Sequence, residues 1–151
     1  MDKEFLKQAI KLAKDSVQAG GFPAGALVVR DGKIIGKGIS VGNIIHDPTA
    51  HGEMIALRNA CTRLRTSDLS GATLYASIEP CMMCLSAAMW SSLPRIIFAC
   101  SSKKVSNDYY GGTYDKSEIN SQFNHPLEII QIAELENESL EIVTAWEKAL
   151  L

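Results

Sequence analysis

Long apolar runs are missing from this sequence, and so is a strong excess of charge of either sign. No stretch approaches the roughly 20 consecutive apolar residues that cross a bilayer, which argues against a membrane-spanning helix. The formal net charge is −2, so the overall charge does not indicate a surface built for a nucleic-acid backbone. Residues 1–17 read as an amphipathic helix, without the apolar block and small-residue cleavage site of a signal peptide. We therefore expect a cytoplasmic protein with no membrane partner.

The cysteine content gives no sign of a disulfide-rich scaffold. The chain has four cysteines, and in a cytoplasmic protein these are usually reduced thiols rather than disulfides. Cys81 and Cys84 are spaced as metal ligands, whereas Cys61 and Cys100 lie in apolar surroundings. A metal-binding or catalytic role for the first pair therefore outranks a disulfide.

What is present has the composition of an ordinary globular protein. Hydrophobic residues make up 46% and charged residues 21% of the 151 residues, which is enough chain to bury a substantial core. The sequence has no internal repeat, linker or low-complexity segment. We expect one domain covering residues 1–151.

Hydrophobic periodicity predicts alternating helices and strands. Asp31-Gly32 joins two β-prone runs and is a two-residue hairpin signal. Asp47-Pro48 reads as the N-cap and first position of a helix, and Pro80 as the start of another. In order, we predict a helix ending near residue 20, strands 24–30 and 33–38, a helix from 47 to about 65, a strand 73–78, a helix 80–92, a strand 95–100, a loop 101–113, a short helical piece 114–121, a strand 128–133 and a terminal helix 138–151.

This order of elements is typical of the α/β class. The hairpin implies an antiparallel edge, while helices between the later strands imply crossover connections. The sheet should therefore be mixed, with five strands and helices on both faces. We predict a three-layer α/β/α sandwich around this sheet.

Two short segments contain residue types suited to zinc: Pro-Thr-Ala-His-Gly-Glu at 48–53 and Glu-Pro-Cys-Met-Met-Cys at 79–84. Cys81 and Cys84 are three residues apart at the start of a predicted helix, which places both sulfurs on one face. The partial positive charge of a helix N-terminus favours thiolates. With His51 as the third ligand, one coordination position of a tetrahedral zinc stays free for water, as in catalytic sites. We expect one Zn²⁺ per chain.

Glu53 is the candidate proton carrier. A zinc-activated water needs a neighbouring carboxylate to take its proton and deliver protons to a departing group. Glu53 stands two residues from His51, and two positions on a regular helix point about 200° apart. The two side chains can share one site only at a helix end, so we predict that this site lies there.

The pairing of His-x-Glu with Pro-Cys-x-x-Cys resembles the zinc nucleobase deaminase signature. The chain is similar to the cytidine deaminase-like superfamily, and within it to the branch of bacterial guanine deaminases and tRNA adenosine deaminases. Further segments match in family order: Pro23-x-Gly25-Ala26, Asp47 to Glu53, Thr73-Leu74-Tyr75 and Glu79 to Cys84. The resemblance weakens after about Cys100, although Ala145-Trp146 is similar to the end of guanine deaminases.

The resemblance implies a fold, a reaction and a set of site residues. The implied fold is the cytidine deaminase-like sandwich. The implied reaction is zinc-dependent hydrolysis of a carbon–nitrogen bond, in which an exocyclic amine is replaced by a carbonyl and ammonia is released. His51, Cys81 and Cys84 would hold the metal and Glu53 would move the protons. Relatives of this branch form dimers, so a homodimer is expected.

The chain departs from the family at positions that read the base. Ser40 stands where an asparagine is common, and Ala24 where guanine deaminases carry a phenylalanine. The acidic residue that reads guanine's edge is replaced by the stretch 109–112, with Asp108 and Asp115 as displaced candidates. Gly52 replaces a usual alanine and is shared with fungal cytosine deaminases. The substrate contacts we predict are Ser40, Ala24, Gly25, Ala26, Pro80, Trp90, Asp108 and Tyr110.

Several readings of the substrate follow. We favour a free purine base or nucleoside of purine metabolism, guanine-like first, on the overall similarity and the slightly acidic charge. Deamination of adenosine to inosine in tRNA is the next alternative, and cytosine or a related pyrimidine is the third. A zinc-stabilised binding domain without enzymatic activity is the non-enzyme alternative.

Overall fold

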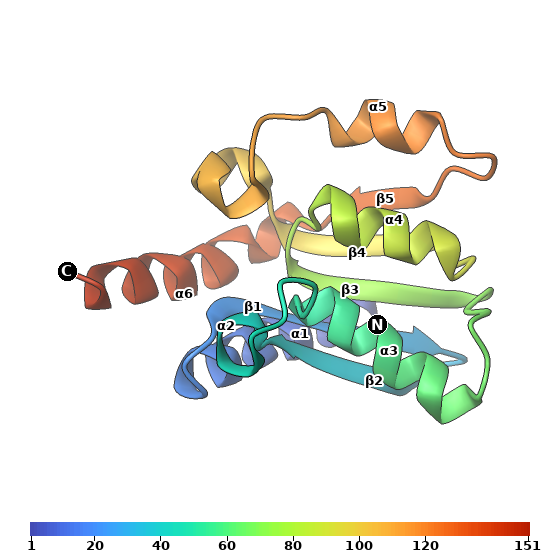
Figure 1. Cartoon of the computed structure of the whole chain (residues 1–151), viewed down its shortest axis with the longest axis horizontal. Coiled ribbons are helices and arrows are strands. Elements are labelled where there is room, and N and C mark those ends of the chain that lie inside the picture. Colours follow the sequence, from blue (N-terminus) through green and yellow to red (C-terminus); the bar gives the residue numbers. More distant parts are fainter.

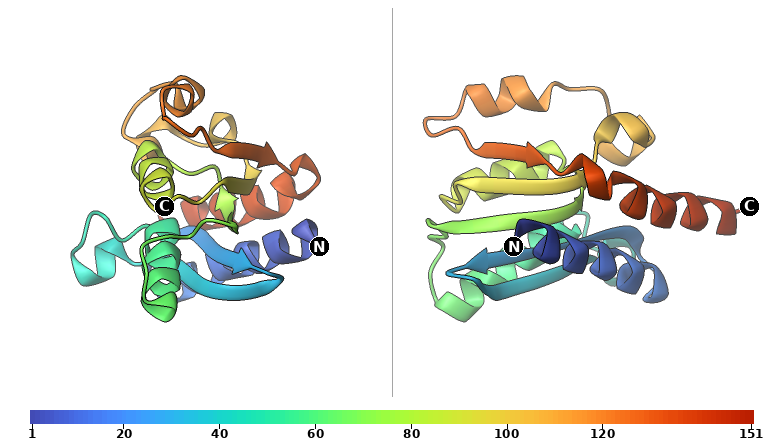
Figure 2. Two further views of the ribbon diagram at one scale, coloured as in Figure 1. Left: turned by 90° about the vertical axis from the view of Figure 1, so that its right-hand side faces the viewer. Right: turned by 180° about the vertical axis from the view of Figure 1, so that it is seen from behind.

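The computed structural model describes residues 1–151 and arranges them in three layers. Helices α3 (Gly52–Leu64) and α4 (Met82–Trp90) cover one face of a central sheet, and α1 (Asp2–Gln18) and α6 (Glu136–Ala149) cover the other (Figures 1 and 2). Two short helices, α2 (Gly42–Ile45) and α5 (Lys116–Ser121), lie at the periphery. The three-layer prediction is confirmed.

The sheet has five strands in the order β2-β1-β3-β4-β5. Strands β1 (Phe22–Arg30) and β2 (Lys33–Ser40) form the antiparallel hairpin, and β1 also pairs antiparallel with β3 (Ala72–Ile78). Strand β3 pairs parallel with β4 (Arg95–Cys100), which pairs parallel with β5 (Glu128–Gln131). The sheet is therefore mixed, as predicted. In the hairpin turn, Asp31 and Gly32 both have positive φ, which is the geometry of a type I′ turn.

Each face of the sheet carries its own hydrophobic core. The larger cluster joins alternate residues of β1, β3 and β4, such as Val28, Leu74 and Ile96, to α3 and α4. The second joins the opposite side chains of the same strands, such as Leu27 and Ile97, to α1 and α6. Successive strand residues point to opposite faces, so nearly continuous apolar runs in these strands fill both cores. This packing places the N-terminal ends of α3 and α4 at the carboxyl end of β3.

Two predicted helix starts are wrong. Helix α3 begins at Gly52 and not at Asp47, with His51 as its N-cap in an extended conformation. The Asp47 carboxylate instead accepts hydrogen bonds from the backbone N–H and hydroxyl of Thr49, so it closes a local turn. Helix α4 begins at Met82 with Cys81 as its N-cap, two residues later than the predicted start at Pro80.

The remaining differences concern element ends and short elements: β1 begins two residues early at Phe22, β2 ends two residues late at Ser40, and α6 begins two residues early at Glu136. Helix α2 was not predicted, β5 ends two residues early at Gln131, and residues 101–113 contain two short 3₁₀ turns at Ser102–Lys104 and Asn107–Tyr110. A third 3₁₀ turn, Ala133–Leu135, precedes α6. No helix of the structure combines the length and the apolar character that a membrane span requires.

Candidate active site

Three potential metal ligands meet where α3 and α4 begin. His51 and Cys81 are the N-cap residues of these helices, and Cys84 lies one turn into α4. His51 Nδ1 lies 3.6 Å from Cys81 Sγ and 3.7 Å from Cys84 Sγ, and the two sulfurs are 3.7 Å apart. The three donor atoms thus form a nearly equilateral triangle.

The size of this triangle fits a zinc ion. Zinc–sulfur bonds of about 2.3 Å and zinc–nitrogen bonds of about 2.0 Å put two tetrahedral sulfurs about 3.8 Å apart and a sulfur and nitrogen about 3.5 Å apart. The donor set of one imidazole and two thiolates is also one that zinc prefers. The candidate ligand atoms of His51, Cys81 and Cys84 all lie within 4.8 Å of one another. They leave a fourth coordination position free of protein.

Glu53 completes the site from the first turn of α3. Its side chain is 5% exposed, and its Oε2 accepts a hydrogen bond from Cys84 Sγ at 3.1 Å. Because His51 precedes α3 in an extended conformation and Glu53 follows in the helix, both side chains reach the same point. The prediction that they share a helix end is confirmed.

Electrostatics at the site follow from burial and from the paired thiols. Burial raises the pKa of Glu53 above its usual value, since desolvation disfavours the charged form. The hydrogen bonds with Cys84 and His51 lower the pKa of Cys81 to about 4. The hydrogen bond with Cys81 in turn raises the pKa of His51. The hydrogen bond with Cys81, burial and the neighbouring Glu53 raise the pKa of Cys84. The site therefore combines a thiol whose pKa is lowered with an adjacent buried carboxyl group that can carry a proton.

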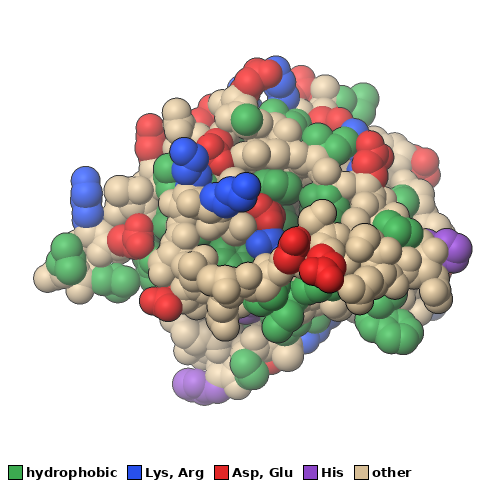
Figure 3. Space-filling model, turned by 90° about the horizontal axis from the view of Figure 1, so that it is seen from above, with side chains coloured by type: hydrophobic (Ala, Val, Ile, Leu, Met, Phe, Trp, Pro, Cys, Tyr) green, Lys and Arg blue, Asp and Glu red, His purple; other side chains and the backbone are tan.

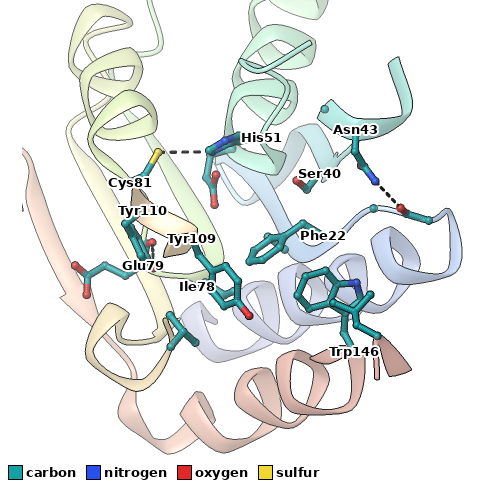
Figure 4. A pocket seen from close by; sticks show the side chains of 17 residues that line it. Phe22, Ser40, Asn43, His51, Ile78, Glu79, Cys81, Tyr109, Tyr110 and Trp146 are labelled. Carbon is teal, nitrogen blue, oxygen red and sulfur yellow. Dashed lines mark hydrogen bonds between the residues drawn. The ribbon is translucent and has the colours of Figure 1, made fainter. Parts of the chain in front are cut away.

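A cavity of about 450 Å³ opens beside this cluster. His51, Glu53 and Cys81 line its inner end, and Figure 4 shows His51 and Cys81 pointing toward one another there. The cavity is larger than a purine base, and ligand sites of 300–1,000 Å³ are typical of small-molecule pockets. It lies at the carboxyl end of β3, where open α/β sheets bind their ligands.

Aromatic side chains from three distant segments form one wall of this cavity. Phe22 of β1, Tyr109 of the second 3₁₀ turn and Trp146 of α6 pack edge to face, with ring centroids 4.9 to 6.1 Å apart. Figure 4 shows the three rings side by side. The Tyr109 hydroxyl also donates to Glu147 Oε2. Helix α6 is thereby fixed to β1 at the cavity.

The structure brings only some of the predicted substrate contacts to the cavity. Ala24, Ser40 and Tyr110 line it. Gly25, Ala26, Pro80, Trp90 and Asp108 are not among the cavity-lining residues, and their role as substrate contacts stays a prediction.

Packing explains why these five residues do not line the cavity. A side chain at Gly25 would collide with the α1 backbone at Ala13, and Ala26 is fully buried in the core. Pro80 is buried just before the metal ligand. Trp90 lies at the far end of α4 and is 80% exposed. Asp108 is exposed to solvent.

Several cavity residues were missed because they are displaced from the family positions. Phe22, two residues before Ala24, supplies the aromatic ring that Ala24 lacks. Asn43, three residues after Ser40, supplies an amide, whose Nδ2 donates to the Gly20 carbonyl at 2.9 Å. Alternation along β1 was a signal for Phe22, because positions two apart share a face. Nothing in the sequence pointed to Asn43, because α2 was not predicted.

Comparison with known proteins finds one family. Residues 1–100 match the family model described as the cytidine and deoxycytidylate deaminase zinc-binding region. The chain is 44% identical over 105 residues to the tRNA-specific adenosine deaminase of Aquifex aeolicus, covering 69% of this chain and 70% of that protein. It is 40% identical over 125 residues to the guanine deaminase of Bacillus subtilis, covering 82% and 78%.

Solved structures give the same picture. A structure from a study of A-to-I editing by tRNA:A34 deaminases at the wobble position aligns with a TM-score of 0.81 at 27% identity, covering 93% of this chain and 99% of that one. The guanine deaminase of Bacillus subtilis aligns with a TM-score of 0.66 at 35% identity, covering 97% and 93%.

Proposed function

The chain belongs to the cytidine and deoxycytidylate deaminase zinc-binding family, and from that premise we propose that it deaminates a free purine base or nucleoside, guanine-like first. The reaction is a zinc-dependent hydrolysis that replaces an exocyclic amine by a carbonyl and releases ammonia. The observation that carries the substrate proposal is the aromatic-lined cavity at the metal ligands.

The protein supplies metal ligands, a proton carrier and a shaped cavity. His51, Cys81 and Cys84 would hold zinc, which supplies a Lewis acid that activates water near neutral pH. Glu53 takes the proton of the attacking water at its carboxylate and delivers protons to the ring nitrogen and the departing amine. Its buried position and raised pKa suit a group that must both accept and donate a proton. The same proposal places the protein in the cytoplasm, where these thiols stay reduced.

The shape and polarity of the cavity favour a small, flat, uncharged substrate. Its 450 Å³ accommodate a purine base or nucleoside, and its lining includes no lysine or arginine. Phe22, Tyr109 and Trp146 offer aromatic surface for a base, and Ser40 and Asn43 offer polar atoms for its edge. On the face shown in Figure 3, basic side chains are interspersed with acidic ones. These features support a free base over a phosphate-rich polymer.

Deamination of adenosine in tRNA is the second candidate. It is favoured by the 44% identity with the Aquifex aeolicus tRNA-specific adenosine deaminase, which exceeds the 40% identity with the Bacillus subtilis guanine deaminase. The guanine deaminase match extends over more of this chain, 82% against 69%.

We also propose that the protein acts as a homodimer. Helix α4 exposes Met82 by 47% and Trp90 by 80%, and large exposed apolar side chains are enriched at protein interfaces. Sedimentation velocity of the zinc-loaded protein should give a dimer, and Trp90→Glu should shift it to monomer. A parent protein that sediments as a monomer at micromolar concentration contradicts this proposal.

Ammonia release distinguishes the substrates. Zinc-loaded protein is assayed with guanine, guanosine, adenine, adenosine, cytosine and isocytosine, and in parallel with unmodified tRNA whose digested nucleosides are analysed for inosine. The proposal expects turnover of guanine or guanosine above the other small molecules. Inosine in tRNA without any turnover of free bases or nucleosides would overturn it in favour of the second candidate.

A further inference from the structure

A partly buried ion pair lies next to the metal ligands in the chain, at the edge of the cavity, and has no part in the chemistry described above. Lys116, the first residue of α5, places its Nζ 3.0 Å from Glu79 Oε2, with side chains 16% and 18% exposed. Figure 4 shows the Glu79 carboxylate on the side away from His51. Removing a charge pair from water is costly. Because Glu79 stands two residues before Cys81, the groups that hold this pair in place bear on the position of that ligand.

The pair is closed into a ring by Ser102. Lys116 Nζ donates to Ser102 Oγ at 3.0 Å, and the Ser102 backbone N–H donates to the other carboxylate oxygen of Glu79 at 3.2 Å. Both oxygens of Glu79 are thus occupied by the segment that follows β4. The carboxylate is held in one orientation, and with it the chain that leads to Cys81.

Two tyrosines extend the same contact to both sides of Cys81. The Tyr110 hydroxyl donates to the Glu79 carbonyl at 2.7 Å. The Tyr114 hydroxyl accepts a hydrogen bond from the Met82 N–H at 3.1 Å, one of the N–H groups left unpaired at the start of a helix. The Lys116 ammonium lies 4.7 Å from the ring centre of Tyr110 and 5.7 Å from that of Tyr114, within cation–π range. Lys116 therefore contacts Glu79 itself and the two tyrosines that hydrogen-bond to residues 79 and 82.

We propose that Lys116 is a positioning residue for the metal site: it holds the segment 101–116 against residues 79–82, and so fixes both the ligand Cys81 and the cavity wall. Val105, Tyr109 and Tyr110 of this segment line the cavity. Zinc retention and the shape of the substrate site then depend on the same ammonium group. The proposal rests on the metal site and not on which base is deaminated, so its test is independent of the substrate assay.

Zinc affinity of matched variants tests the proposal. Lys116→Met removes the charge and keeps most of the side chain, and Lys103→Met removes an exposed charge from the same segment. Zinc dissociation constants are measured by competition with a chromogenic chelator, at a temperature where near-ultraviolet circular dichroism shows each variant folded. Residues that orient metal ligands typically contribute 10- to 100-fold to metal affinity. We expect Lys116→Met to raise the zinc dissociation constant by about 10-fold or more, and Lys103→Met to leave it unchanged.

Glu79→Gln and the double variant complete the test. If the pair acts as a unit, the loss in Glu79→Gln/Lys116→Met is smaller than the product of the two single losses. A Lys116→Met protein that melts earlier but binds zinc as Lys103→Met does would overturn the proposal, because the lysine would then stabilise the fold alone. If Lys116→Met does not fold, the double variant is compared with Glu79→Gln. Because the proposal treats Lys116 and Glu79 as a unit, it expects the same zinc dissociation constant for both proteins. A further tenfold loss in the double variant also overturns the proposal.

Discussion

At the scale of single residues, proton transfer and metal binding fall to different side chains, although Glu53 and the ligand Cys84 are in contact. Glu53 accepts a hydrogen bond from Cys84, but the candidate metal ligands are His51, Cys81 and Cys84. The Glu53 carboxyl group is buried and forms no salt bridge, which is an expensive arrangement for a structural residue. A proton-carrying role explains why it is retained there.

Substitution Glu53→Gln separates these two roles. It keeps the size of the side chain and removes its ability to carry a proton, so turnover should fall by about 100- to 10,000-fold, the range of general acid–base catalysis. The metal ligands are untouched, so zinc content measured by atomic emission should stay at one ion per chain. Loss of zinc or of the folded state in this variant would favour a structural role for Glu53 instead.

The two tryptophans provide a matched pair for testing the cavity. Trp146 lines the cavity and packs on Phe22, whereas Trp90 is exposed outside it. Trp146→Ala removes part of the aromatic wall and should raise KM for the base by about 10-fold or more, since base–aromatic stacking contributes about 1–3 kcal/mol. Trp90→Phe, which keeps an apolar ring at its position, should leave KM unchanged. Equal KM values for the two variants would exclude Trp146 as a substrate contact.

At the scale of elements, the site depends on how closely α3 approaches the hairpin. A Cβ at Gly38 of β2 would collide with the backbone carbonyl of Gly52 and lie 2.5 Å from the N–H nitrogen of Ala56, both in α3. The helix that carries Glu53 therefore lies directly on the strand backbone. A glycine here permits this close approach and so sets the height of the site above the sheet.

Gly38→Ala should therefore be destabilising. Backbone atoms cannot move aside as a side chain can, so we expect a loss of about 1–3 kcal/mol in the free energy of unfolding, the usual cost of overpacking. Urea denaturation followed by circular dichroism measures it. Lys37→Ala, an exposed position on the same strand, should stay within about 0.5 kcal/mol of the parent protein. Equal midpoints for the two variants would show that α3 can shift without cost.

The sequence predicted elements with strong patterns better than it predicted their ends. Strand β4 was predicted with its observed bounds, because an apolar run between Pro94 and polar residues leaves one interpretation. The start of α3 was missed because Asp47 can cap either a helix or a turn, and only contacts within the turn decide between them. For the metal ligands, residue type and spacing sufficed. The cavity wall could not be predicted, because Phe22, Tyr109 and Trp146 meet only through the packing of α6 against β1.

At the scale of the whole molecule, the metal ligands join two helices that the core already holds in place. Helices α3 and α4 share the larger hydrophobic cluster with three strands, so the layers do not depend on the metal for their existence. This differs from small zinc-folded domains, where metal binding supplies the folding free energy. Zinc should therefore add stability to a chain that stays folded without it.

Removal of zinc and variation of pH test this expectation together. Zinc at 100 times its dissociation constant adds about 2.7 kcal/mol, which corresponds to a rise in Tm of roughly 5–10 °C for a chain of this size. Without metal, the hydrogen bond with Cys81 raises the pKa of His51 above 6.5. The stability from this pair is therefore fully present below pH 6.5 and is lost as the pH rises through the raised pKa. Zinc binding requires deprotonated ligands and releases protons, so its contribution grows with pH.

The difference in Tm between zinc-loaded and chelator-treated protein should consequently widen from pH 6 to pH 8. Differential scanning calorimetry measures both forms, and circular dichroism at 25 °C should show the chelated chain still folded. Cys84→Ser removes one ligand and should abolish the response to chelator at every pH. A chelated parent chain that loses its secondary structure at 25 °C would instead make the metal a structural requirement of the fold. A chelated chain that stays folded would indicate that the metal serves catalysis and not folding.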